Sequence, residues 1–277
     1  MTLWPAATPT PEDAEGHGAR NADIDWNVFD PEAYVDHNYQ SLRQDDAAIV
    51  GIMRDHFSQH CHDNPGAPLA GIDVGTGANL YPALALLPWC REVTLFERSQ
   101  ANIAWLRQQT PHYGTNWDNF WDLLCKAEPY AAISDPRLAL RTAARVQPGD
   151  LFELPKKRWD VGTLFFVAEG MTTSYEEFRE ALRSFAECLV PGAPFAAAFM
   201  ESSRGYTVGG ASFPACSVGQ DEVRAALGDY AEPDLRIDLV TFTDAPLRDG
   251  YSGMILACGR RKCAPETGRP VPGARKG

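Results

Sequence analysis

A glycine-rich turn is the feature of this sequence best suited to binding a ligand. Residues 71–82 read Gly-Ile-Asp-Val-Gly-Thr-Gly-Ala-Asn-Leu-Tyr-Pro, an apolar strand that runs into a turn and then a helix. Gly75 and Gly77 allow positive φ and let a ligand approach the amino end of the helix. The turn lacks the Gly-Lys-Ser/Thr of a P-loop, and Leu80 replaces the third glycine of a dinucleotide fingerprint. A ligand without a pyrophosphate is therefore favoured.

Two acidic residues follow at the ends of later strands. Glu97 ends the apolar run 93–97, about 20 residues after Gly75, where a carboxylate can accept hydrogen bonds from both hydroxyls of a ribose. Asp150 follows Val146-Gln-Pro-Gly and is placed to receive the amino group of an adenine. An adenosine with a short zwitterionic chain fits these groups, and this points to S-adenosylmethionine.

The composition limits the classes of partner. The chain has 25 Lys and Arg against 37 Asp and Glu, a net charge of −12, which argues against nucleic acid and anionic membranes. Seven scattered cysteines without a C-x-x-C pair suggest neither a disulfide framework nor a zinc ribbon, and fit a reducing cytosol. His56 and His60 are spaced for a metal site but lack the Glu of H-E-x-x-H. We expect a soluble cytoplasmic protein, a monomer or homodimer, with a small-molecule substrate and no metal.

Apolar runs alternate with helical patterns along the chain, which predicts a doubly wound, Rossmann-like α/β sheet. The expected strands are 70–74, 93–97, 161–167, 195–200 and 254–258, and the expected helices are 80–87, 100–109, 175–189 and 220–227. No helix separates residues 237–242 from the last strand, so these two are expected to pair antiparallel at one edge.

One domain is expected over residues 24–263. Residues 1–23 and 264–277 are rich in Pro, Ala, Thr and Gly without periodicity, and are predicted to be disordered tails. Within the domain, residues 24–62 are predicted to form a helical lid that includes a helix over 41–62. Residues 110–145 are too long for one connection and are predicted to be a helical insertion over the sheet.

Several blocks of the sequence resemble one family of small-molecule methyltransferases. The blocks are Phe29-Asp-Pro-Glu-Ala-Tyr-Val-Asp-His-Asn-Tyr39, residues 72–81, Glu97-Arg-Ser-Gln-Ala-Asn102, Thr163-Leu164 and residues 203–209 with Phe213. The family includes nicotinamide, phenylethanolamine and indolethylamine N-methyltransferases and thioether S-methyltransferase, and the match covers most of residues 29–262. The resemblance implies the class I methyltransferase fold, a seven-stranded, mostly parallel sheet with an antiparallel edge strand. It also implies S-adenosyl-L-methionine as cofactor and S-adenosyl-L-homocysteine as product.

The resemblance also implies roles in cofactor binding. Tyr34 and Tyr39 match tyrosines that close over the cofactor, and Glu97 matches the acid that holds the ribose. The other residues that it places around the cofactor are Asp73, Gly75, Gly77, Asn79 and Tyr81 at the turn and its methionine end, and Asn102, Asp150, Leu151 and Thr163 around the adenosine. Asn79 stands where some relatives have threonine.

The same resemblance places a carboxylate near the substrate nitrogen, and Glu169 in Phe166-Val-Ala-Glu-Gly is the best match for it. Such a group can hold an ammonium and take its proton. Glu201 lies near a second acidic position but is shifted in register. The predicted substrate residues are Tyr39, Phe166, Glu169, Glu201, Ser203 and Tyr206. Together with Tyr34, Phe165 and Phe213 these would give aromatic walls, which suit a cationic sulfonium or ammonium.

We therefore expect methyl transfer to a small aromatic or amine-bearing molecule, with N-methylation first. C- or O-methylation of an indole or phenol in a biosynthetic pathway is the alternative. With an aromatic nitrogen or ring carbon as acceptor, no strong base is needed, and Glu169 would orient the substrate or balance charge. A sensor that binds S-adenosylmethionine without turnover stays open, because fold alone does not establish chemistry.

Overall fold

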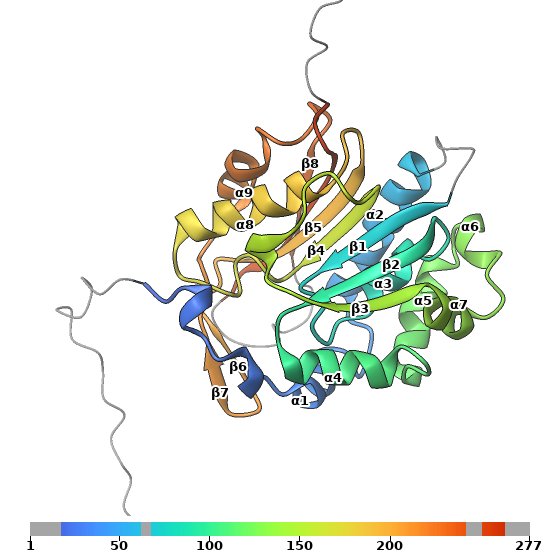
Figure 1. The fold of residues 1–277 in the computed structure, drawn as a ribbon, viewed down its shortest axis with the longest axis horizontal. Coiled ribbons are helices and arrows are strands. Elements are labelled where there is room, and N and C mark those ends of the chain that lie inside the picture. Colours follow the sequence, from blue (N-terminus) through green and yellow to red (C-terminus); the bar gives the residue numbers. More distant parts are fainter. Residues whose placement is uncertain (1–17, 62–67, 242–250, 264–277) are drawn as a thin grey trace, which may run out of the picture.

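The computed structural model describes residues 18–61, 68–241 and 251–263 of the chain. Within these residues, seven strands form one sheet in the order β3-β2-β1-β4-β5-β9-β8 (Figure 1). Pairing is parallel from β3 to β5, whereas β9 runs antiparallel to both β5 and β8. The predicted sheet, mostly parallel with an antiparallel edge, is confirmed. In sheet order the strands are Ala144–Pro148, Cys90–Glu97, Leu69–Val74, Val161–Phe165, Pro194–Glu201, Gly253–Arg260 and Arg236–Val240.

Helices cover both faces of the sheet (Figure 1). Helices α8 and α9 pack on one face, and α2, α3, α4 and α5 pack on the other. The helices are α1 Pro31–Asn38, α2 Gln44–His60, α3 Tyr81–Leu86, α4 Gln100–Gln109, α5 Asp118–Leu124, α6 Glu128–Ala131, α7 Pro136–Ala143, α8 Tyr175–Cys188 and α9 Gln220–Leu227. Helices α4 and α9 have the bounds that the sequence predicts. No helix among the described residues combines the length and the apolar character that crossing a membrane requires.

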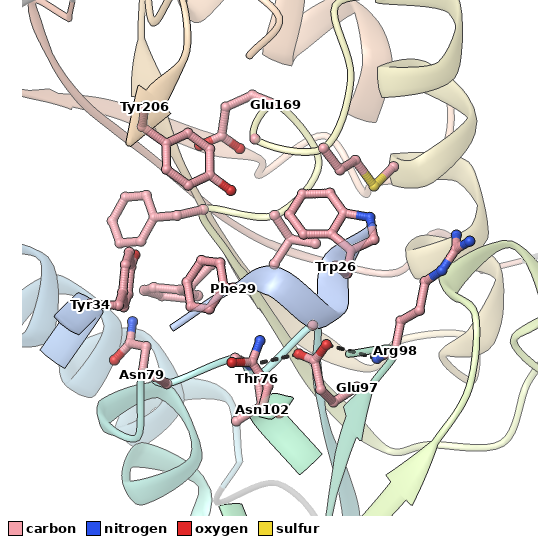
Figure 2. Close-up of a pocket in the computed structure, with 18 of the residues that line it drawn as sticks. Trp26, Phe29, Tyr34, Thr76, Asn79, Glu97, Arg98, Asn102, Glu169 and Tyr206 are labelled. Carbon is pink, nitrogen blue, oxygen red and sulfur yellow. Dashed lines mark hydrogen bonds between the residues drawn. The ribbon is translucent and has the colours of Figure 1, made fainter. Parts of the chain in front are cut away.

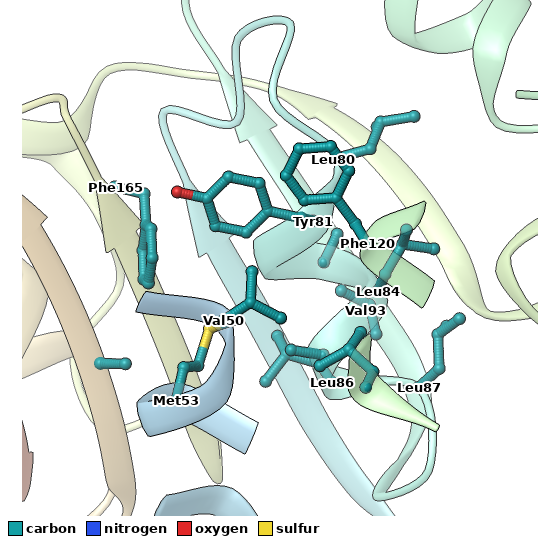
Figure 3. Packing of buried hydrophobic residues seen from close by; sticks show 14 of the residues in the cluster. Val50, Met53, Leu80, Tyr81, Leu84, Leu86, Leu87, Val93, Phe120 and Phe165 are labelled. Carbon is teal, nitrogen blue, oxygen red and sulfur yellow. The ribbon is translucent and has the colours of Figure 1, made fainter. Parts of the chain in front are cut away.

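The central strands are buried on both sides because their side chains alternate between two apolar layers. In β5, Phe195 and Phe199 face α8, where they contact Phe185 and Phe178 edge to face. On the other face, Tyr81 stacks on Phe120 of α5 with ring centroids 5.3 Å apart (Figure 3). Helix α5 of the expected insertion therefore packs on α3.

The order of the strands reverses beside β1, because the chain first builds outward to β2 and β3 and then returns to add β4 on the other side. In open α/β sheets, ligands bind at the carboxyl ends of the strands at such a switch point. The glycine turn follows β1 there. Gly75 and Gly77 have φ of +64° and +55°, and a Cβ on Gly75 would lie 2.7 Å from Val167. The turn therefore requires glycine at position 75 for both conformation and space.

Three parts of the fold differ from the sequence expectations or extend them. Strand β3 begins at Ala144, inside the expected helical insertion. The sequence does not predict this strand, because it is a partly exposed edge strand without an apolar run. A hairpin of β6 (Tyr206–Val208) and β7 (Ala211–Phe213) was not expected, although its turn, Gly209-Gly210, has positive φ at both residues. Residues 18–23, expected within the tail, are described and contact α8 and the residues just before it. The Ala19 carbonyl accepts from the Thr173 N–H at 2.9 Å, and Glu177 of α8 accepts from the Asn21 N–H at 3.0 Å.

Other expectations fall on residues outside the described ones. These are most of the two predicted tails, residues 1–17 and 264–277, the end of the predicted lid at His62, and the end of the predicted strand at Phe242.

Candidate cofactor and substrate site

A pocket lies at the carboxyl ends of β1, β2, β4 and β5, beneath the N-terminal segment 21–39 (Figure 2). In Figure 2, Glu97 and Asn102 come from one end of this pocket, and Glu169 and Tyr206 from the other. The predicted site residues that line it are Tyr34, Tyr39, Gly75, Gly77, Asn79, Glu97, Asn102, Leu151, Phe166, Glu169, Ser203 and Tyr206. The predicted residues that lie behind or beside its wall are Asp73, Tyr81, Asp150, Thr163 and Glu201.

Glu97 is held in place by backbone donors. Its Oε2 accepts from the Gly77 N–H at 2.8 Å, and its Oε1 accepts from the N–H groups of Arg98 at 2.8 Å and Ser99 at 2.7 Å (Figure 2). Burial raises the pKa of Glu97, while these N–H groups and Asn102 lower it. The carboxylate is thus a positioned hydrogen-bond acceptor at the end of β2, in contact with the glycine turn.

Asp150, the other acid expected near the adenosine, bonds to protein groups and does not line the pocket. Asp150 forms an ion pair with Arg98 at 2.8 Å and accepts from the Phe152 N–H at 3.0 Å. Its neighbours Gly149 and Leu151 line the pocket instead. Leu151 and Asn102 thus offer one apolar and one amide surface at the end where the adenosine is expected.

Asp73 and Thr163 support the turn from below. The two residues are partners in the register of β1 and β4, and Thr163 Oγ1 donates to Asp73 Oδ1 at 2.7 Å. Both are buried, and burial raises the pKa of Asp73 to about 7, against the hydrogen bonds from Thr163 and Thr76, which lower it. In this structure they position the turn from behind the pocket wall.

Asn79 and Tyr81, expected at the methionine end, lie close to Tyr34 and Tyr39, the two tyrosines expected to close over the cofactor. The rings of Tyr34 and Tyr39 have centroids 5.8 Å apart, and those of Tyr39 and Tyr81 are 5.9 Å apart. Tyr81 is fully buried with its hydroxyl toward Phe165 (Figure 3). Asn79 Oδ1 accepts from the Tyr81 N–H at 3.3 Å, while Asn79 Nδ2, also buried, has no hydrogen-bond partner within the described part of the chain.

Glu169 is the buried carboxylate of the opposite end, with 1% of its surface exposed. Its Oε1 accepts from the Met200 N–H at 2.9 Å, which links the segment after β4 to the end of β5. Phe166, the first residue after β4, has φ of +58°, a strained conformation for a residue with a side chain. Such strain is found at functional sites, where the surrounding structure holds it.

The remaining predicted substrate residues separate into two groups. Ser203 is buried and lines the pocket, as does Tyr206 of the hairpin. Glu201 points away, where its Oε2 accepts from the Ser252 hydroxyl at 2.7 Å. Its shift in register, visible in the sequence, therefore corresponds to a position beside the pocket rather than in its wall.

A stack of three rings joins the hairpin to the N-terminal segment. Tyr206 stacks on Phe213 with centroids 5.3 Å apart, and Phe213 stacks on Trp26 with centroids 5.4 Å apart and planes 10° from parallel. Trp26 and Phe29 line the pocket, whereas Phe213 lies behind them. Trp26 and Phe29, which form an aromatic roof over the pocket, are thus held by contacts with hairpin residues nearly 200 positions further along the chain.

Several lining residues were not predicted from the sequence. The principal ones are Trp26, Phe29, Asp46, Arg98, Met171, Met200 and Met254. Trp26 and Phe29 are close to the expected tail, and Asp46 is one of two acids in the first turn of a helix, a placement that the helix dipole alone explains. The aromatic residues at positions 26, 29, 34 and 39, close together in the sequence, were the available signal for this aromatic wall.

A model of the family described as NNMT/PNMT/TEMT matches residues 21–245. No curated protein matches the sequence. Among solved structures, the N-methyltransferase NodS from Bradyrhizobium japonicum, in complex with S-adenosyl-L-homocysteine, is 12% identical with a TM-score of 0.47, covering 84% of this chain and 99% of that chain.

Two further solved structures have similar values. The 1,6-didemethyltoxoflavin-N1-methyltransferase from Burkholderia thailandensis is 13% identical with a TM-score of 0.49, and 94% of each chain is covered. The magnesium protoporphyrin IX methyltransferase from Synechocystis, with bound S-adenosylmethionine, is 15% identical with a TM-score of 0.49, covering 84% of this chain and 92% of that chain. At such identities nothing about the substrate of this chain follows from the likeness.

Proposed function

Because the chain belongs to the NNMT/PNMT/TEMT family, we propose that it transfers a methyl group from S-adenosylmethionine to the nitrogen of a small aromatic or amine-bearing molecule. Membership of this family supports the transfer of a methyl group from S-adenosylmethionine. The choice of nitrogen as acceptor rests on one observation of this structure, the buried carboxylate of Glu169 in a largely aromatic pocket.

The residues of the pocket fit the cofactor. Glu97 presents a fixed acceptor for the ribose hydroxyls, and Leu151 with Asn102 lies at the adenosine end. The unpartnered Asn79 Nδ2 is available as a donor at the other end. When bound, S-adenosylmethionine supplies an electrophilic methyl group on a sulfonium, so the protein is asked for positioning and exclusion of water rather than covalent chemistry.

Glu169 is the group at the acceptor end that can bind an amine and receive its proton. An amine attacks a methyl group only as the neutral base, and a carboxylate can hold the ammonium and receive its proton. Because Met200 N–H fixes Oε1, the carboxylate keeps one orientation in the pocket. The aromatic rings of Tyr34, Tyr39 and Tyr206 surround the space with faces that attract cations.

The experiment is label transfer from methyl-deuterated S-adenosylmethionine to a panel of pyridines, arylalkylamines, indoles, phenols and thioethers, followed by mass spectrometry. Label on the nitrogen of a pyridine or an amine is the expected result. Label on carbon, oxygen or sulfur would overturn the choice of nitrogen and keep the methyltransferase. Binding of the cofactor without label on the panel or on a metabolite extract would favour a sensor.

A further inference from the structure

Asp46 is a second buried carboxylate in the wall of the pocket. It lies in the first turn of α2, with 2% of its surface exposed, and faces the pocket. Its neighbour Asp45 is equally buried but lies outside the wall, where Arg43 Nε approaches its Oδ1 at 3.3 Å. Asp45 thus has a cationic partner in the protein, and Asp46 is the acid of the pair that faces the pocket.

Asp46 lies beside Tyr39 and Tyr81, two of the residues expected around the cofactor. Its charge raises the pKa of both Tyr39 and Tyr81, which places it beside these two rings. Tyr81 in turn adjoins Asn79, whose Nδ2 is a buried donor without a partner in the described part of the chain. Figure 2 shows the Asn79 amide directed toward Tyr34, on the same wall of the pocket. This end of the pocket therefore combines an acidic acceptor with an unused donor.

A buried carboxylate and a buried unpaired donor each cost free energy unless a ligand satisfies them. A zwitterion satisfies both, since its ammonium matches the acid and its carboxylate matches the donors. The amino-acid part of S-adenosylmethionine is such a group.

We propose that Asp46 accepts a hydrogen bond from the α-ammonium group of the cofactor, while Asn79 Nδ2 donates to its α-carboxylate. This inference rests on the proposed function, since it takes S-adenosylmethionine as the ligand of the pocket. Burial and, after it, the charge of Asp45 raise the pKa of Asp46 to about 7, against Arg43 and a hydrogen bond from Tyr81, which lower it. A cation beside the carboxylate would offset that burial.

Calorimetric titration with three ligands tests the assignment. The ligands are S-adenosylhomocysteine, its deaminated analogue, which keeps the carboxylate and lacks the ammonium, and 5′-methylthioadenosine, which lacks the whole amino-acid part. The proteins are the wild type, Asp46→Asn and, as a matched control from the same helical turn, Asp45→Asn.

We expect Asp46→Asn to weaken binding of S-adenosylhomocysteine by at least roughly tenfold, and to leave methylthioadenosine within about twofold. The wild type should lose a similar factor on the deaminated analogue, and Asp46→Asn should lose none. Asp45→Asn should keep the full preference of the wild type for the ammonium.

Three results would overturn the assignment. The first is equal affinity of the wild type for S-adenosylhomocysteine and its deaminated analogue, which needs no variant and so survives a failure of Asp46→Asn to fold. The second is an unchanged affinity of Asp46→Asn for S-adenosylhomocysteine together with a raised KM for the acceptor. The third is an equal loss on all three ligands. Failure of the wild type to bind S-adenosylhomocysteine would instead reject the proposed function.

Discussion

The carboxylate of Glu169 accepts a hydrogen bond from the backbone N–H of Met200 at 2.9 Å. Glu169 follows β4 and Met200 lies within the neighbouring parallel strand β5, so the bond ties the acid to the sheet rather than to a loop. An acid that is held in this way keeps its orientation when a substrate enters. Its chemistry can therefore be tested by changing charge while keeping shape.

Replacement of Glu169 by Gln is expected to lower kcat by roughly 100-fold or more for an amine acceptor, because the amide can still accept from Met200 N–H but cannot take a proton. The affinity for S-adenosylhomocysteine should stay the same. Steady-state kinetics and calorimetry give the two quantities. Glu201→Gln is the matched control, since Glu201 ends β5 outside the pocket wall. An unchanged kcat in Glu169→Gln would remove this residue from the reaction.

Replacement of Glu97 by Gln is expected to weaken cofactor binding by at least roughly tenfold, since it removes the charge that the ribose hydroxyls would meet and places an amide N–H against a backbone N–H. Calorimetric titration with S-adenosylhomocysteine measures the change. Glu92→Gln on the same strand is the control, because Glu92 is half exposed and pairs with Arg145 at 3.5 Å. Equal affinities for the wild type and Glu97→Gln would contradict the ribose assignment.

Gly75→Ala is expected to lower the free energy of unfolding by roughly 1–3 kcal/mol and to abolish cofactor binding, because the new Cβ meets Val167 at a residue with positive φ. Gly51→Ala provides the contrast. Gly51 lies within α2 and a Cβ there meets nothing within 4 Å, so alanine should stabilise the fold by about 0.5–1 kcal/mol. Urea unfolding of both variants checks the two opposite signs.

Cofactor binding should strengthen with pH between 6 and 8, by about tenfold. The raised pKa of Asp46, about 7, means that the acid is largely protonated at pH 6 and ionised at pH 8, and only the ionised form attracts an ammonium. The groups that act on its pKa are Asp45, Arg43 and Tyr81. Binding of S-adenosylhomocysteine across this range should be flatter in Asp46→Asn than in the wild type. Asp73 has a pKa of about 7 as well, and burial also raises the pKa of Glu97, so a slope that persists in Asp46→Asn would assign the pH dependence to these two acids.

The long elements of the fold are predictable from the sequence, whereas the short and edge strands are not. Long buried strands and amphipathic helices carry their own periodicity, which is why α4 and α9 were predicted to the residue. The three-residue strands β6 and β7 are too short for any period to appear, although Gly209-Gly210 marked their turn. Edge strand β3 lacked the apolar run of a buried strand.

Within the site, motif residues indicated the neighbourhood of the pocket but not the direction of each side chain. Glu97 and Glu169 line the pocket, whereas Thr163 and Asp73 bond to each other behind the turn. Asp46 was not predicted as a site residue because the helix dipole by itself favours an acid in the first turn of a helix. Only the packing of α2 against the pocket distinguishes it from Asp45.

The stack of Trp26, Phe213 and Tyr206 has a kinetic consequence. Trp26 and Tyr206 line the pocket, so a ligand that leaves past them requires the face of Trp26 to separate from that of Phe213, which exposes both rings to water. The lifetime of the bound product then depends on ring area at position 26, independently of the groups that bind the ligand itself. A turnover rate that is limited by this separation would increase when Trp26 is made smaller, even though equilibrium affinity decreases.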